Sequence, residues 1–113
     1  MELQEINLSL LTENEGSDTF SFQGIPLGRA VDKKNDSASY QTNVEIYKTE
    51  EGIFVIYVSY REKDGEINFA DVASTDSLDV GSVRAALKES DIYPGTFYSE
   101  AIYHSFNSLK KLE

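Results

Sequence analysis

The sequence contains no cysteine, and this absence excludes disulfide bonds, thiolate metal sites and cysteine nucleophiles. It also lacks an apolar run close to the ~20 residues that a membrane-spanning helix needs. Residues 1–5 do not combine a basic region with an apolar core, so we predict no signal peptide. Together these absences lead us to expect a cytoplasmic protein without a membrane partner.

Positive charge is scarce, because 10 Lys and Arg residues stand against 20 Asp and Glu residues and give a net charge of −10. Affinity for nucleic acids depends largely on contacts between basic side chains and phosphates. We therefore expect no nucleic-acid partner, and any protein partner should present a basic or neutral surface. The simplest role of the excess acidity is to keep a small protein in solution.

Motifs typical of catalytic and metal sites are also missing. No serine occupies a Gly-x-Ser-x-Gly elbow, and the single histidine, His104, is the one side chain that ordinarily titrates near neutral pH. Residues 13–18 resemble a calcium loop in composition but lack its ligand spacing. Residues 24–28 contain two glycines but no Lys-Ser or Lys-Thr, so they form no phosphate loop. We predict no catalytic residue, no metal ion and no cofactor.

The chain does contain one nearly unbroken run of apolar, β-branched and aromatic residues, at positions 52–60. This run predicts a central strand with two apolar faces, because side chains alternate between the faces of a strand. One face carries Phe54, Ile56, Val58 and Tyr60, and the other carries Ile53, Val55 and Tyr57. Both faces therefore need a cover.

Alternating apolar and polar residues predict further strands on both sides of this run. The predicted strands are residues 3–11, 19–23, 40–48 and 67–73. Residues 24–28 should form a corner or a bulged edge, because Pro26 cannot donate a backbone hydrogen bond. Residues 32–39 show no apolar periodicity, and we expect them to form a mobile surface loop.

The apolar period changes toward the carboxyl end, where two helices are predicted. Asp79 can cap a first helix in which Val80, Val83 and Leu87 share one face. Thr96 can cap a second helix with a longer apolar stripe. The residues of that stripe are Tyr98, Ile102, Phe106 and Leu109.

This order of elements predicts a single α+β domain over residues 1–113. We expect an antiparallel sheet, a meander of about five strands, with one or two C-terminal helices packed on one face. The last two residues, Leu112 and Glu113, could be left over from cloning.

The apolar face that carries Ile53, Val55 and Tyr57 is one candidate site. Helices of the predicted length cannot cover both faces of the central strand, so either the first hairpin or a partner subunit must cover this one. Tyr103 joins it as a possible interface residue, because helical spacing places it away from the apolar stripe.

A second candidate site lies on the last predicted helix. Glu100 and His104 are one helical turn apart, so their side chains can pair. With Tyr98 they could stand at the mouth of a pocket between the sheet and the helices. A solvated pair on the helix surface is the simpler interpretation.

Several segments, taken in order, carry a resemblance to a known family. They are the alternating residues 5–10, residues 20–27, residues 45–52 leading into the apolar strand, and Pro94 ahead of a helix. In this order they resemble the bacterial EXLDI family, whose members are small domains of unknown function. The resemblance implies no established activity and assigns no functional residue.

Small size, acidity and the missing catalytic motifs lead us to expect a non-enzymatic domain that binds another protein or itself, for example as a homodimer. Two alternatives stay open. One is small-molecule binding, or weak enzymatic activity, in a pocket between the sheet and the helices. The other is an acidic inhibitor whose carboxylates mimic the phosphates of a nucleic acid.

Overall fold

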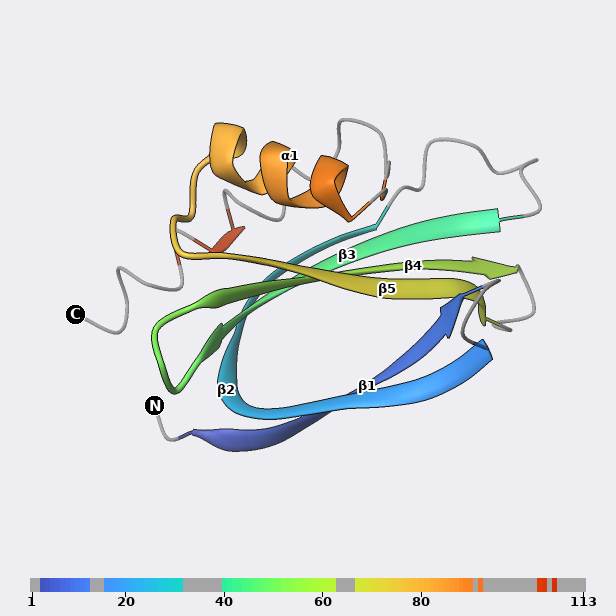
Figure 1. The fold of residues 1–113 in the computed structure, drawn as a ribbon, viewed down its shortest axis with the longest axis horizontal. Helices are drawn as coiled ribbons and strands as arrows, with labels where there is room; N and C mark the ends of the chain where they lie inside the picture. Colours follow the sequence, from blue (N-terminus) through green and yellow to red (C-terminus); the bar gives the residue numbers. More distant parts are fainter. Residues whose placement is uncertain are drawn as a thin grey trace.

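The computed structural model describes residues 3–12, 16–31, 40–62, 67–90, 92, 104–105 and 107. Over these residues the chain forms five antiparallel β-strands and a C-terminal helix, α1 (Figure 1). The elements are β1 (Gln4–Thr12), β2 (Gly16–Val31), β3 (Tyr40–Thr49), β4 (Phe54–Glu62), β5 (Ile67–Thr75) and α1 (Val80–Glu89). Each predicted strand is present, but β2 is much longer than the predicted 19–23, and β4 and β5 each end two residues later than expected.

The strands pair in sequence order, and the sheet closes on itself as a small barrel. Within the described residues, β1 reaches β5 through the pair Leu11 and Ala70. The predicted meander of antiparallel strands is therefore confirmed, whereas the closure was not anticipated. Figure 1 shows how it arises, because the long strand β2 curves and carries β1 beneath the other strands.

The curvature of β2 centres on residues 24–28. The first half of β2 pairs with β1 and its second half pairs with β3. The register with β3 shifts between Pro26 and Gly28, which leaves Leu27 as the extra residue of a β-bulge. The predicted bulge is confirmed, but the strand continues through it. At Gly24 a Cβ atom would lie 2.6 Å from the carbonyl oxygen of Lys48, so this crossing requires glycine.

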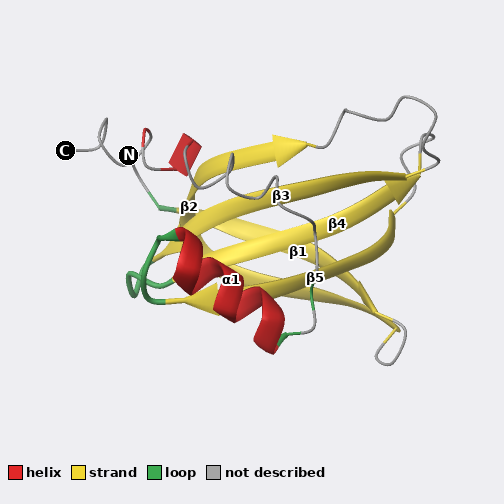
Figure 2. Ribbon diagram, turned by 90° about the horizontal axis from the view of Figure 1, so that it is seen from above, coloured by secondary structure: helices red, strands yellow, loops and turns green. Residues whose placement is uncertain are grey.

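Two apolar clusters occupy the two sides of the barrel wall. The inner cluster draws side chains from all around the barrel: Ile6, Leu8, Leu10, Phe22, Tyr47, Val55, Tyr57, Ala70 and Val72. The outer cluster lies between the wall and α1, and its largest fully buried members are Val44, Ile46, Ile56, Val58, Val83 and Ile92. Figure 2 shows α1 lying across the outside of the strands. The predicted placement of a helix on one face is therefore observed on the outer face of a barrel.

The central strand β4 separates the two clusters as its alternation predicts. Ile56 and Val58 pack in the outer cluster, whereas Val55 and Tyr57 pack in the inner one. The first hairpin, β1–β2, covers the inner face, which is one of the two covers expected from the sequence. The Tyr57 hydroxyl donates to the carbonyl oxygen of Ser9 on β1 at 2.7 Å, so β4 and β1 are also joined by a hydrogen bond.

Helix α1 begins at the predicted cap. An Asp79 carboxylate oxygen accepts from the backbone N–H of Ser82 at 2.8 Å, and this contact holds the pKa of Asp79 below its usual range. Val83 and Leu87 are buried as expected, but Val80 is 42% exposed. The expectation for Val80 was wrong because the buried face starts one turn later, at Val83.

Some expectations fall outside the described residues. These are the mobile loop at 32–39, the turn at Asp64 and Gly65, and the final Leu112 and Glu113. The second predicted helix is described at residues 104, 105 and 107, which are helical, and Ser105 is buried there.

Candidate binding site

A row of polar side chains crosses the inner face of β2, β3 and β4. Arg29 stands opposite Glu45 in the β2–β3 register, and Glu45 stands opposite Tyr57 in the β3–β4 register. Residues directly opposite each other in antiparallel strands point to the same face. Asn43 and Tyr47 flank Glu45 at two-residue spacing along β3, so they share that face as well.

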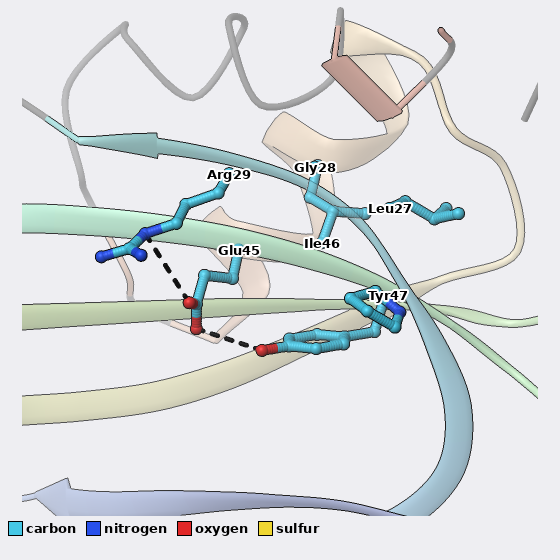
Figure 3. A pocket seen from close by; sticks show the side chains of 7 residues that line it. Leu27, Gly28, Arg29, Glu45, Ile46 and Tyr47 are labelled. Carbon is cyan, nitrogen blue, oxygen red and sulfur yellow. Dashed lines mark hydrogen bonds and ion pairs between the residues drawn. The ribbon is translucent and has the colours of Figure 1, made fainter. Parts of the chain in front are cut away.

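Glu45 is the centre of this group. Its Oε1 atom lies 3.8 Å from Arg29 Nε, and its Oε2 atom accepts a hydrogen bond of 3.2 Å from the Tyr47 hydroxyl. Figure 3 shows Arg29 and Glu45 reaching toward one another, with the Tyr47 ring below them. Arg29 also donates from Nη2 to Asn43 Oδ1 at 3.3 Å. The four side chains therefore form one connected polar network.

The network borders a pocket of about 260 Å³, which we call the β2–β3 pocket. It is lined by Pro26, Leu27, Gly28, Arg29, Glu45, Ile46 and Tyr47. The local sequence explains its position, because the bulge at Leu27 interrupts the even spacing of β2 and β3. Pro26 brings no backbone N–H to the opening.

The charged groups of the pocket keep access to solvent. The Arg29 side chain is 62% exposed and that of Glu45 is 27% exposed. Tyr47 is buried, and burial together with the negative charge of Glu45 raises its pKa above the ordinary tyrosine value. Tyr47 therefore stays protonated and acts as a hydrogen-bond donor to Glu45.

Two buried polar atoms stand next to the network. Asn43 and Ser59 are opposite each other in the β3–β4 register, and both side chains are buried. Asn43 Nδ2 and Ser59 Oγ make no hydrogen bond within the described part of the chain. Buried donors without a partner are uncommon and costly, so this spot favours a water molecule or a ligand atom that can accept.

The residues predicted to form an interface differ in their exposure to solvent. Val55 and Tyr57 are 3% and 4% exposed inside the barrel, so they are not available to a partner subunit. Of the two covers expected for this face, the first hairpin is the one present, because side chains of β1 and β2 pack against Val55 and Tyr57. Ile53 precedes β4 and is 40% exposed. Tyr103 lies outside the described residues.

Of the residues predicted to line a pocket between the sheet and the helices, the structure describes one. His104 is described, and its side chain is exposed. Glu100 and Tyr98 lie outside the described residues, so the pairing of Glu100 with His104 and the place of Tyr98 at a pocket mouth stay predictions. The structure instead brings together Arg29, Glu45 and Tyr47, on the other side of the barrel wall from α1.

Sequence reasoning did not single out Arg29, Asn43 or Glu45. Polar residues that alternate with apolar ones on a strand are normally read as the wet face of a sheet. Tyr47, on the same face as Glu45, was assigned only to a core edge. The available signal was the combination of a charged residue, Glu45, and an aromatic residue, Tyr47, on that face.

The described residues contain no group of three or more His, Asp or Glu side chains that could hold a metal ion. Within the same part of the chain, no helix combines the length and the apolar character needed to cross a membrane. Comparisons with protein-family models, with curated proteins and with solved structures found no match to this chain.

Proposed function

We propose that this chain is a non-enzymatic binding domain that holds a small polar molecule in the β2–β3 pocket. The observation that carries the proposal is the pair Arg29 and Glu45, two opposite charges 3.8 Å apart that line one pocket and stay partly exposed. Ligand sites combine a concave surface with a few convergent polar groups, and this pocket has both features.

The volume of the pocket supports a small ligand. At about 260 Å³ it is slightly below the ~300 Å³ at which pockets for drug-sized ligands begin. A compact metabolite fits this space, whereas a protein segment needs a longer groove. The polar network also gives the ligand both donors, from Arg29, and an acceptor, from Glu45.

Binding suits the chemistry of the lining better than catalysis does. The raised pKa of Tyr47 makes it a poor base at neutral pH, and its proton is already directed at Glu45. Arg29 is permanently charged and cannot transfer a proton under ordinary conditions. These properties favour a site that orients and holds a molecule.

The test is a screen of small-metabolite mixtures by saturation-transfer NMR, performed with the full chain and with Arg29→Gln. We expect at least one metabolite class to bind the unchanged chain and to lose its signal with Arg29→Gln. Arg84→Gln is a matched control, because Arg84 is exposed on α1 and its loss removes the same charge. Binding that is equal in all three proteins, or absent from all of them, would contradict the proposal.

Association with a protein is the second candidate, and exposed apolar side chains favour it. They are Leu3, Phe20, Ile53 and Val80. The start of β1, the turn between β3 and β4 and the start of α1 lie at one end of the barrel (Figure 1), and three of the four residues belong to these segments. Light scattering over a range of concentrations tests self-association, and a dimer lost on Ile53→Glu would support it.

A further inference from the structure

The charge pair in the β2–β3 pocket also indicates which class of ligand fits, provided that the pocket is a binding site as proposed above. We propose that the ligand is a zwitterion, a free α-amino acid of small side chain. Its carboxylate would meet Arg29, and its ammonium group would meet Glu45. The two charged groups of an α-amino acid are attached to the same carbon atom. They are therefore close together, as Arg29 and Glu45 are.

The geometry of the pair leaves room for this exchange. Direct hydrogen bonds between a guanidinium and a carboxylate are about 2.7–2.9 Å long, whereas Arg29 Nε and Glu45 Oε1 are 3.8 Å apart. The pair is therefore close enough to set the local charge pattern but not locked in a direct hydrogen bond. Arg29 has five N–H donors, so it can bind a carboxylate while Nη2 keeps its contact with Asn43.

Asn43 does not line the pocket, but it holds the guanidinium group that does. Its Oδ1 atom accepts from Arg29, which places the amide group beside the guanidinium. Its Nδ2 atom is buried and has no acceptor among the described residues, and the same holds for Ser59 Oγ across the β3–β4 pair. Neither Asn43 nor Ser59 lines the pocket, so Asn43 contributes by holding Arg29 rather than by binding the ligand itself.

Charge balance argues against ligands of a single sign. A plain anion would be repelled by Glu45, and a plain cation would be repelled by Arg29. A zwitterion satisfies both groups without leaving either charge opposed. Pro26 and the ring of Tyr47 line the same pocket and offer apolar surface to a short side chain.

The experiment is isothermal titration of the full chain with glycine, alanine, serine and valine, together with two analogues of each. The N-acetyl analogue removes the ammonium charge, and the amide analogue removes the carboxylate charge. We expect each analogue of the best ligand to bind about tenfold more weakly than its parent, which corresponds to the loss of one charge-assisted contact.

Two variants assign each charge to its partner. With Glu45→Gln the parent and its N-acetyl analogue should bind with similar affinity, and with Arg29→Gln the parent and its amide analogue should do so. Glu89→Gln and Arg84→Gln are the matched controls, because both residues are exposed on α1 and each control removes the same charge. Circular dichroism with thermal melting identifies any variant that fails to fold, and in that case the analogue series with the unchanged chain decides alone.

Three results would overturn the inference. Equal binding of the N-acetyl analogue to the unchanged chain would indicate a simple carboxylate ligand, and equal binding of the amide would indicate a simple cation. If no amino acid binds while another metabolite binds in an Arg29-dependent way, the ligand class is wrong and the proposed function stands. If nothing binds in an Arg29-dependent way, both fail.

Discussion

At the scale of single residues, Tyr47 connects the core of the barrel with the candidate site. Its ring meets Phe22 edge to face, with ring centroids 5.7 Å apart, and its hydroxyl donates to Glu45. Burial and the nearby carboxylate both disfavour its ionised form. The side chain of Tyr47 therefore stabilises the core and also holds the Glu45 carboxylate in place at the pocket.

Tyr47→Phe should lower the free energy of unfolding by about 1 kcal/mol near neutral pH, because Glu45 loses a hydrogen-bond donor. The pKa of Tyr47 is raised in the folded chain, so its stabilising contribution is present below the ordinary tyrosine pKa of 10.0 and is lost as the pH rises above it. Urea denaturation in near-neutral and in alkaline buffer measures the difference between the two proteins. This difference in the free energy of unfolding should be smaller in the alkaline buffer. A difference that does not change with pH would contradict a raised pKa for Tyr47.

Ser59→Ala tests the buried hydroxyl. Because Ser59 Oγ has no hydrogen-bond partner in the described chain, removing it should leave the free energy of unfolding unchanged or raise it by up to about 1 kcal/mol. Chemical denaturation is the measurement. A loss of more than about 1 kcal/mol would mean that the hydroxyl is bonded, for example to a buried water molecule.

At the scale of elements, β2 determines the architecture, because one strand of 16 residues serves two partners. Two strand carboxylates also accept hydrogen bonds from the backbone of the residue that follows them. Asp18 accepts from the backbone N–H of Thr19, and Asp71 accepts from that of Val72, each at 2.8 Å.

Gly24→Ala should destabilise the fold by about 1–3 kcal/mol, because the added Cβ would meet the Lys48 carbonyl oxygen at 2.6 Å and backbone must move. Gly81→Ala is a matched change in α1, where the nearest atom is the Asp79 Oδ1 at 3.4 Å. This second substitution should be neutral or stabilising by up to about 1 kcal/mol, because alanine favours helix. Thermal melting of both variants checks the pair, and equal melting temperatures would contradict the bend at Gly24.

Local patterns predicted most of these elements, since alternation marks a strand and a cap residue marks a helix start. Asp79 and the run from Phe54 to Tyr60 are examples. The closure at Leu11 and Ala70 was not predictable in this way, because it depends on the path of β2 through Pro26 rather than on any local period. The charged residues of the site were missed for the same reason. Their alternation with apolar residues predicts a solvent-facing side of the sheet, and that side becomes the inner side only when the sheet closes.

At the scale of the whole molecule, closure decides which surfaces can function. It places Val55 and Tyr57 inside and leaves the β2–β3 pocket as an opening in the wall, where Arg29, Glu45 and Tyr47 stand beside apolar lining residues (Figure 3). The chain as a whole carries a net charge of −10, and Arg29 brings a positive charge to the lining of this pocket. The candidate site therefore depends on the barrel rather than on a helix surface.

Closure can be tested with a cysteine pair, since the natural sequence has no cysteine. Leu11→Cys with Ala70→Cys joins residues that are directly opposite in the β1–β5 pair. Opposite residues of antiparallel strands have Cα atoms about 4.5–5.5 Å apart, which suits a disulfide bond. We expect an intramolecular disulfide and a higher melting temperature under oxidising conditions, whereas an open sheet would give free thiols or disulfide-linked dimers.

The central claim is that the binding site lies in the barrel wall between β2 and β3. Amide chemical-shift mapping of the full chain with its bound metabolite tests this claim most directly. The account predicts that the largest shifts fall on residues 27–29 and 45–47, which border the β2–β3 pocket. Shifts concentrated on α1, at residues 80–89, or the absence of shifts at both pocket segments, would contradict it.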